Sequence, residues 1–535
     1  MKHKWHKALD ILLATVLAVA VVVFILMPFL FVLRGAFLHQ GQFGLGNFML
    51  IKWRSAVNSL RMGALTSLLS TTVAGCIALF LYIHQSKLKQ VILVVLAITM
   101  ISPPFVTALS YINLFGRRGL ITYRLLGLSI WPYGLWGIVL MQTLSDISIN
   151  TLILFSFMQQ IDRTQIDASQ SLGAKTNHII VDILLPHMKN GLLTIAVLSF
   201  LRSVADFGTP SVIGGAYNVL ATDSYFTVIA EGNIGKSAAI NVLILLPSIF
   251  AFSIYQKNIK NTAPVGHGSY TSGTNLAPKG LLYRLFAGIS IFFILWLGLQ
   301  YCSIALSAFT TMRKGVFVFT LDNIKNTLPH INSSVWRSIV YSLISAGLGS
   351  VLGLLIAYYL KIRKMKLFAL IDTVATLPYI IPGTFFGLGY LMFFSKPPIM
   401  IMGTAAIVVL NIVFKQLPFS TKMGNTAMAD IGQDTLHSVK DLGGSRINEI
   451  VDIVFPLCKP ALGVSFINAF TTTMTTVGSI IFLIYPSQKV LTIVMYDVIQ
   501  SGKYDVGSVI ALLIILICML VNGLFLLLQR KRKHS

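Results

Sequence analysis

The sequence has few charged residues and especially few acidic ones. Only 11% of its 535 residues are charged, with 17 Asp and Glu against 41 Lys and Arg. Soluble domains carry about 25% charged residues, so this composition excludes them. Hydrophobic residues make up 55% of the chain and gather in about a dozen runs of the length that spans a bilayer. Since a bilayer cannot hydrate backbone groups, we expect an all-α integral membrane protein.

Cysteine is also scarce, and its four copies are scattered. They are Cys76, Cys302, Cys458 and Cys518. No Cys-x-x-Cys or Cys/His spacing links them, so the sequence predicts neither a metal site nor a disulfide framework.

Catalytic motifs are missing as well. Gly235-Lys236-Ser237 looks like the end of a phosphate-binding loop, but Ala230 stands where that loop requires glycine. Neither His-Glu-x-x-His nor Gly-x-Ser-x-Gly occurs. We therefore expect no catalytic, cofactor-binding or nucleotide site in this chain, and not an enzyme.

The formal net charge of +24 could indicate nucleic acid as a partner. The cations, however, flank apolar runs instead of forming one interleaved patch. The pattern favours topology anchors beside a lipid bilayer, and we expect no nucleic-acid binding.

The apolar runs fall into two sets of six predicted spans. The first set is 11–33, 60–83, 91–115, 135–158, 192–212 and 239–255. The second set is 285–307, 338–360, 367–394, 405–428, 462–484 and 507–528. The stretch between them is rich in Asn, Gly, Ser, Thr and Pro, which is typical of a linker. We predict a first domain at 1–255, a cytoplasmic linker at 256–284 and a second domain at 285–535.

Twelve spans place both termini on one side of the membrane. The N-terminus carries Lys2, Lys4 and Lys7, and the tail carries four basic residues at 530–533. By the positive-inside rule, both termini are expected in the cytoplasm. Three arginines fall on the predicted extracytoplasmic side, against the positive-inside bias: Arg117, Arg118 and Arg124.

Two polar stretches between spans repeat each other. Residues 167–186 and 437–456 share Leu-Gly and a final Pro at a spacing of 270 positions. The first pair is Leu172-Gly173 and the second is Leu442-Gly443. A repeat of this length indicates a duplicated domain.

These stretches resemble the cytoplasmic loop of permease subunits of ATP-binding cassette (ABC) importers, whose pattern is Glu-Ala-Ala, three residues, Gly, then a spacer to Ile-x-Leu-Pro. Asp167-Ala168 stands for Glu-Ala, whereas the second copy has His437-Ser-Val there. The resemblance implies twelve transmembrane helices arranged as two six-helix type I importer repeats in a bacterial inner membrane. It also implies two copies of a cytoplasmic ATPase, which hold the ATP, and an extracytoplasmic solute-binding protein.

The resemblance assigns ATPase docking to both loops. The expected docking residues are Asp167, Ala168, Leu172, Gly173, Ala174, Pro186, Leu442, Gly443, Gly444 and Pro456. Asp167 and Ala168 suit the first turn of a short helix, where an acid favours the positive end of the dipole. Gly173 permits a turn to a second helix, and Pro186 starts the next segment. Because the second loop lacks the acid, we expect it to be the weaker coupler.

Asp206-Phe-Gly-Thr-Pro lies within the fifth predicted span, where a carboxylate is costly. It resembles permeases of the ferric-iron import family, as does the stretch 114–122. Asp206 either offers an oxygen to a cation or pairs with Arg202 one turn earlier. Prolines in the third span of each half would kink the helix, either to line a cavity or only to pack. The candidate pathway residues are Asp206, Gly208, Thr209, Gly478, Pro104 and Pro382.

One further charge, Lys415, lies in a span before Pro418, and we expect it to snorkel or to bond a carbonyl freed by that proline. The resemblance points to ferric iron as the solute, with thiamine, polyamines and aminoethylphosphonate as alternatives within the same class. A secondary transporter built from six plus six spans is the alternative from a different class.

Overall fold

The computed structural model describes residues 2–84, 87–99, 104–117, 119–128, 131–260, 280–313, 316–441 and 443–533. The described chain is helical apart from two short antiparallel hairpins. Leu442, most of the predicted linker and Pro103 lie outside the described residues. The symbol η marks π-helical turns, except η6, which is a 3₁₀ turn.

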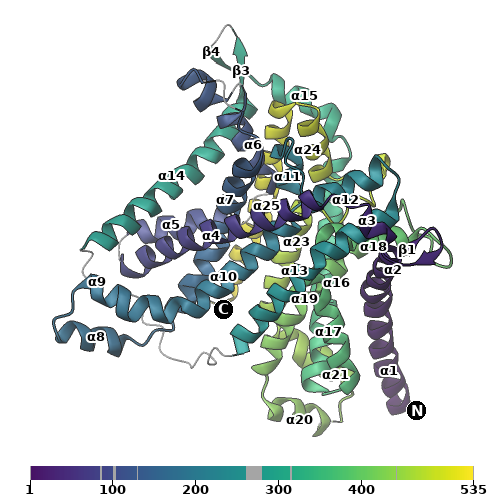
Figure 1. Cartoon of the computed structure of the whole chain (residues 1–535). Coiled ribbons are helices and arrows are strands. Elements are labelled where there is room, and N and C mark those ends of the chain that lie inside the picture. The colour runs from purple at the N-terminus through teal and green to yellow at the C-terminus, as the bar shows by residue number, and fades with distance from the viewer. Residues whose placement is uncertain are drawn as a thin grey trace.

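The first half contains thirteen α-helices, three π turns and one hairpin among its described residues (Figure 1). They are α1 (Lys2–Val21), η1 (Val22–Leu26), α2 (Met27–Phe37), β1 (Leu38–His39), β2 (Gln42–Phe43), α3 (Gly46–Met49), α4 (Trp53–Ile83), α5 (Lys87–Thr99), α6 (Pro104–Phe115), η2 (Leu120–Leu125), α7 (Leu135–Met158), α8 (Arg163–Ser171), α9 (Thr176–Ile179), η3 (Ile180–Leu184), α10 (Leu185–Ala205), α11 (Gly208–Ile213), α12 (Leu220–Ile229) and α13 (Ile234–Lys260).

The second half repeats this order. Its elements are α14 (Leu281–Phe309), β3 (Thr310–Arg313), β4 (Val316–Phe319), α15 (Asp322–Ile331), α16 (Ser334–Ala357), η4 (Tyr358–Ile362), α17 (Lys366–Ile380), α18 (Gly383–Phe394), α19 (Ala405–Ala429), α20 (Gln433–Asp441), α21 (Arg446–Asn448), η5 (Glu449–Val454), α22 (Phe455–Leu457), α23 (Lys459–Thr475), η6 (Pro486–Gln488), α24 (Leu491–Gln500) and α25 (Tyr504–Lys533).

Among the described residues, eight helices are long and apolar enough to cross a membrane, and two bent helix pairs bring the number to ten. The bent pairs are α17 with α18, at 116°, and the segment α21–α22 with α23, at 73°. The two remaining predicted spans correspond to α5 with α6 and to α19. The layout is therefore twelve spans in two six-helix repeats.

Two details of the predicted spans are wrong. The third span of the second half is not one helix, because it bends sharply between Ile380 and Gly383. The fifth spans end early, at Ala205 and Thr475, and do not continue to 212 and 484. In the first half, the backbone becomes extended at Asp206, and a short separate helix, α11, follows.

Three π turns directly precede prolines. They are η1, η3 and η5, and the prolines are Pro28, Pro186 and Pro456. Proline lacks the N–H of a regular helix and its ring crowds the carbonyl one turn earlier. A widened π turn provides the room, so α9, η3 and α10 form one continuous helix from Thr176 to Ala205.

Matching hydrogen bonds show the duplication at the level of side chains. Asn47 donates to the carbonyls of Gly35, Ala36 and Leu38. Asn323 donates in the same way to those of Ser307, Ala308 and Thr310. Each asparagine thus satisfies the free carbonyls at the end of the first span of its half.

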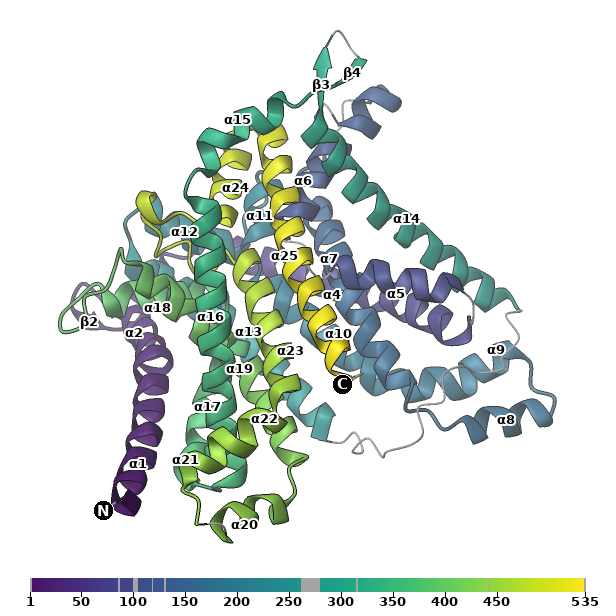
Figure 2. The ribbon, with the colours of Figure 1, turned by 180° about the vertical axis from the view of Figure 1, so that it is seen from behind.

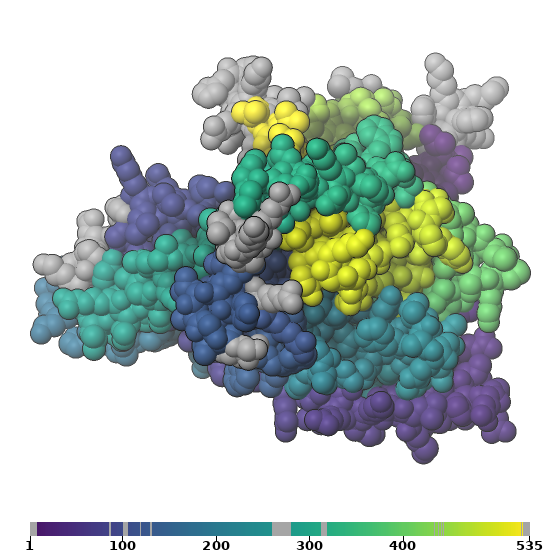
Figure 3. All heavy atoms as spheres, turned by 90° about the horizontal axis from the view of Figure 1, so that it is seen from above, coloured from purple at the N-terminus to yellow at the C-terminus, as the bar shows by residue number. Residues whose placement is uncertain are grey.

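The first span of each half packs against the other half. Helix α2 contacts α18, whereas α14 contacts α4 and α6. Figures 1 and 2 show α1 and α14 on opposite flanks of the bundle. Seen from above in Figure 3, C-terminal residues in yellow lie beside blue and teal residues of the first half. The two halves therefore form one interlocked bundle.

Candidate functional site

The first repeated loop begins with a capped helix. The Asp162 carboxylate accepts a hydrogen bond from the Thr164 backbone N–H at 2.9 Å, and α8 starts at Arg163. This hydrogen bond lowers the pKa of the exposed Asp162 carboxyl. Asp167 lies in the middle of α8, so the prediction that it occupies the first turn is wrong. Asp162 takes the capping role because it stands directly before the helix.

A glycine turn ends α8 and has a counterpart in the second loop. Gly173 has φ +86° and Gly443 has φ +73°, both in the left-handed region. The Ala174 N–H reaches back to the Ser169 carbonyl at 3.0 Å, and Gly444 repeats this bond. Left-handed backbone favours glycine, which confirms that Gly173 provides the turn to a second helix.

The loop helices are held by one apolar face and expose the other. Ile166 in α8 and Leu436 in α20 are buried, at matching positions. Asp167 and Ala168 are exposed, and Leu172 is 89% exposed. The predicted role of these residues in docking stays a prediction. Pro186 lies inside the continuous helix 176–205, so the prediction that it starts a separate segment is wrong, and Pro456 likewise lies within the helical segment Arg446–Leu457.

Both loops lie at the same end of the bundle as the N-terminus, as Figure 1 shows for α8 and α20. The second loop is also tied to the first span. Asp10 of α1 is buried, and its carboxylate lies 3.3 Å from Arg446 of α21 and 3.6 Å from Arg363. Tyr359 donates to the same carboxylate at 3.0 Å. Sequence reasoning missed this contact, because Asp10 lies more than 340 positions before each of its three partners.

Two cavities lie where the halves meet, with volumes of about 500 and 300 Å³. Both are lined by Ala205, Asp206, Gly383, Lys415 and Thr476. Among the predicted pathway residues, Thr209 and Pro382 line the larger cavity, and Gly208 and Gly478 line the smaller. Pro104 begins α6, next to Phe105 of the smaller cavity.

Asp206 is held by groups other than Arg202. Its carboxylate accepts from Gln142 Nε2 at 3.0 Å and from the Gly208 N–H at 2.8 Å. Of the two predicted alternatives, the pair with Arg202 one turn earlier is not formed, because α10 ends at Ala205 and the backbone is extended at Asp206. Asp206 thus stabilises the break in the fifth span.

Arg202 instead forms an ion pair with Asp146 of α7, at 2.9 Å. It also donates to Asn150 Oδ1 at 2.6 Å. Sequence reasoning missed Asp146. The signal was a carboxylate inside the apolar run 135–158, together with an arginine in another span.

Lys415 of α19 donates to the carbonyl of Pro378 at 2.7 Å and to that of Ile381. Lys415 was expected either to snorkel or to bond a carbonyl freed by Pro418, and its acceptors are instead carbonyls of another helix and bend. The freed carbonyls lie instead at the 116° bend between α17 and α18. Lys415 therefore holds this bend open toward both cavities.

A close backbone contact borders the cavities. A Cβ on Gly387 would lie 2.4 Å from the Ser479 carbonyl oxygen, and one on Gly383 would lie 3.1 Å from the Ser479 nitrogen. Only glycine permits this approach of α18 to the segment after α23. Among the described residues, no three His, Cys, Asp or Glu side chains gather in a group that could hold a metal ion.

The sequence pattern of a known family matches this chain twice. The family is described as "Binding-protein-dependent transport system inner membrane component", and it matches residues 70–261 and 349–534. Each match contains one of the two repeated loops. The two matches together cover more than half of the chain.

Individual relatives are transport permeases. The chain is 27% identical to "Ferric transport system permease protein FbpB" of Actinobacillus pleuropneumoniae over 87% of this chain and 69% of the relative. A similarly named protein of Haemophilus influenzae is 28% identical over 82% of this chain and 72% of its own. "Thiamine transport system permease protein ThiP" of Salmonella typhimurium is 21% identical over 87% of both chains.

Proposed function

This chain belongs to the family of binding-protein-dependent transport system inner membrane components, and from that premise we propose that it carries ferric iron into the cytoplasm. It is a membrane permease of an ABC importer and not an enzyme. Partner proteins of the ATPase and solute-binding types follow from the family. The cargo, the docking residues and the transport cycle below are proposals.

The iron proposal rests on two relatives that are named as ferric transport permeases and that align over most of the chain. The thiamine permease aligns over a similar length with lower identity. Thiamine, polyamines and aminoethylphosphonate are the alternative cargoes. In the cavities, the carboxylates of Asp146 and Asp206 already have partners, so we infer that a separate binding protein selects the solute.

Two copies of a cytoplasmic ATPase would dock at the two loops, one at each. Leu172 and Gly173 form the tip of the first contact, and Gly443 and Gly444 form that of the second. Docking at this end places the nearby N-terminus in the cytoplasm, in agreement with its basic residues. The C-terminus belongs on the same side by the count of spans.

The continuous helix 176–205 supplies a path from loop to pathway. Its 30 residues correspond to about 45 Å. The turn at Gly173 lies just before one end, and the break at Asp206 follows the other. When the ATPases close on ATP, the loops move together, the helix carries that motion to the break, and the cavities open outward. Hydrolysis would reverse the motion, which gives alternating access.

Reconstitution tests this function. The purified chain, its ATPase and its binding protein are placed in vesicles, and uptake of ferric iron is measured with and without ATP and vanadate. We expect uptake that needs ATP and stops with vanadate. ATP-dependent uptake of thiamine but not iron would reject the cargo alone. Uptake driven by a proton gradient without the ATPase would favour the secondary transporter and reject the proposal.

A further inference from the structure

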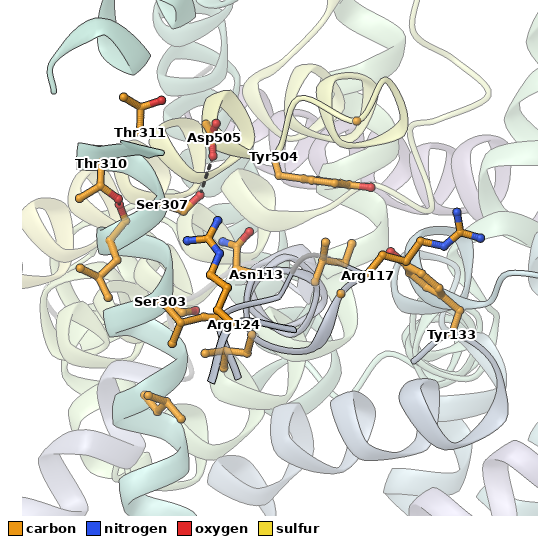
Figure 4. A pocket seen from close by; sticks show the side chains of 17 residues that line it. Asn113, Arg117, Arg124, Tyr133, Ser303, Ser307, Thr310, Thr311, Tyr504 and Asp505 are labelled. Carbon is orange, nitrogen blue, oxygen red and sulfur yellow. Dashed lines mark hydrogen bonds between the residues drawn. The ribbon is translucent and has the colours of Figure 1, made fainter. Parts of the chain in front are cut away.

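A third cavity, of about 540 Å³, lies at the opposite end of the bundle from the loops. The ends of α6 and α14, the start of α25 and the turn η2 surround it (Figure 4). It shares no lining residue with the two central cavities. Its chemistry therefore needs an explanation separate from the transport pathway.

The wall contributed by α14 changes from apolar to polar along the helix. Leu299, Ser303, Leu306 and Ser307 of α14 line the cavity, and their spacing places them on one helix face. Leu299 and Leu306 are exposed on the outside of the bundle. From Leu299 to Ser307 the helix rises about 12 Å, less than half of a hydrocarbon core of about 30 Å. A lipid with its headgroup at the polar end of the cavity would lay its acyl chain along the leucines.

The polar end holds opposite charges and a hydrogen-bonded wall. Figure 4 shows the Arg124 guanidinium beside Ser307 and Asn113, with Asp505 above. Ser307 Oγ donates to Asp505 Oδ1 at 3.1 Å. Ser508 Oγ donates to Ser307 at 3.0 Å and accepts from Asn113 Nδ2 at 3.3 Å. A guanidinium suits a phosphate, and the carboxylate beside it suits an ammonium group.

The exposed side chains near the cavity are of the kinds found at a membrane–water interface. Exposed apolar and aromatic residues occur from η2 to the start of α7: Tyr123, Leu125, Leu126, Leu128, Trp131 and Trp136. Tyrosine and tryptophan are enriched at headgroup level. Arg117 lies over the Trp131 ring at 4.2 Å. Arg117 and Arg124 both line the cavity beside these residues, as expected for a site at headgroup level.

We propose that this cavity binds one phospholipid whose headgroup carries a phosphate and an ammonium, as phosphoethanolamine does. The phosphate binds Arg124 and Asn113, the ammonium binds Asp505, and an acyl chain follows Leu306 and Leu299. Binding of a lipid phosphate would explain why Arg124 lies on the predicted outer side, where the positive-inside rule expects few basic residues. The assignment does not depend on the cargo or on the ATPase.

Native mass spectrometry of the purified full chain in detergent tests the site. Phosphatidylethanolamine and phosphatidylglycerol are titrated into the wild type, Arg124→Gln and the matched control Arg54→Gln, an exposed arginine at the start of α4. We expect one phosphatidylethanolamine that binds the wild type and the control at least fivefold more tightly than Arg124→Gln. Asp505→Asn should abolish the preference for phosphatidylethanolamine over phosphatidylglycerol.

Two further measurements keep the result interpretable. Arg124→Lys retains the charge and should recover part of the binding, and thermal unfolding without added lipid should be the same for the wild type and Arg124→Gln. Equal lipid binding by Arg124→Gln and the wild type would overturn the proposal. So would saturation of the site by glycerophosphoethanolamine, which lacks acyl chains, at the same concentration as by the lipid.

Discussion

At the scale of single residues, the cap of α8 depends on one exposed carboxylate. Asp162 accepts the Thr164 N–H, and this bond lowers the carboxyl pKa in the folded state. A carboxyl with a lowered folded pKa stabilises above its unfolded pKa and loses that effect as pH falls through the folded value. The cap is therefore complete at neutral pH and lost only in acid.

We predict that Asp162→Ala loosens α8, whereas Asp162→Asn keeps it, because asparagine is also a good N-cap. Hydrogen exchange of residues 163–171 at neutral pH measures this directly. At neutral pH the alanine variant should exchange faster than the wild type across α8, and the ratio of the two rates measured at equal pH should fall to one only in acid. Equal exchange rates in both variants would mean that the cap does not hold the helix.

Gly387 of α18 packs against the backbone of the segment after α23, within the second half. A Cβ there would meet the Ser479 carbonyl at 2.4 Å, so Gly387→Ala should destabilise by about 1–3 kcal/mol and impair transport. Gly347→Ala in α16 is the matched control, because a Cβ there meets nothing within 4 Å. Thermal unfolding in detergent and uptake in vesicles compare them. If the two variants unfold at the same temperature and transport equally well, the close contact at Gly387 does not limit stability or transport.

At the scale of elements, the two helices that follow the loops differ. The first runs unbroken from Thr176 to Ala205, whereas its counterpart bends by 73° between Leu457 and Lys459. Pro460 follows the bend, and the matching position in the first half is Asn190. Since an unbroken helix transmits displacement better than a bent one, we infer that the first loop is the stronger coupler.

Asn190→Pro should introduce the same bend into the first helix, because proline inside a helix costs about 3 kcal/mol and kinks it. We expect less solute transported for each ATP hydrolysed, while ATPase activity remains. Asn190→Ala controls for the loss of the amide side chain. If Asn190→Pro kept the wild-type ratio of transport to hydrolysis, the continuous helix would not be the coupling element.

The elements were predictable where the signal is local. Apolar runs located the spans, and the glycine at 173 marked its turn because left-handed backbone favours glycine. The breaks in the spans were not predictable, because they depend on distant partners. Lys415 reaches the carbonyls of Pro378 and Ile381 from another helix, and Gln142 reaches Asp206 from α7.

At the scale of the whole molecule, the duplicated halves share a scaffold but differ in chemistry. Asn47 and Asn323 make matching hydrogen bonds, and Ser59 and Ser338 each accept a backbone N–H at 2.8 Å. In the cavities, the first half supplies Asp146, Arg202 and Asp206, and the second supplies Lys415. A fused chain permits such asymmetry, because each half can change independently.

The most direct measurement is cross-linking from Leu172→Cys, which places a thiol on the exposed tip of the first loop. Vesicles of known orientation containing the ATPase are treated with a bifunctional thiol reagent, and the wild type controls for the four native cysteines. We predict a cross-link to the ATPase on the cytoplasmic side, with a yield that changes when ATP is added. Labelling of this thiol from the extracytoplasmic side, with no ATPase captured, would contradict it.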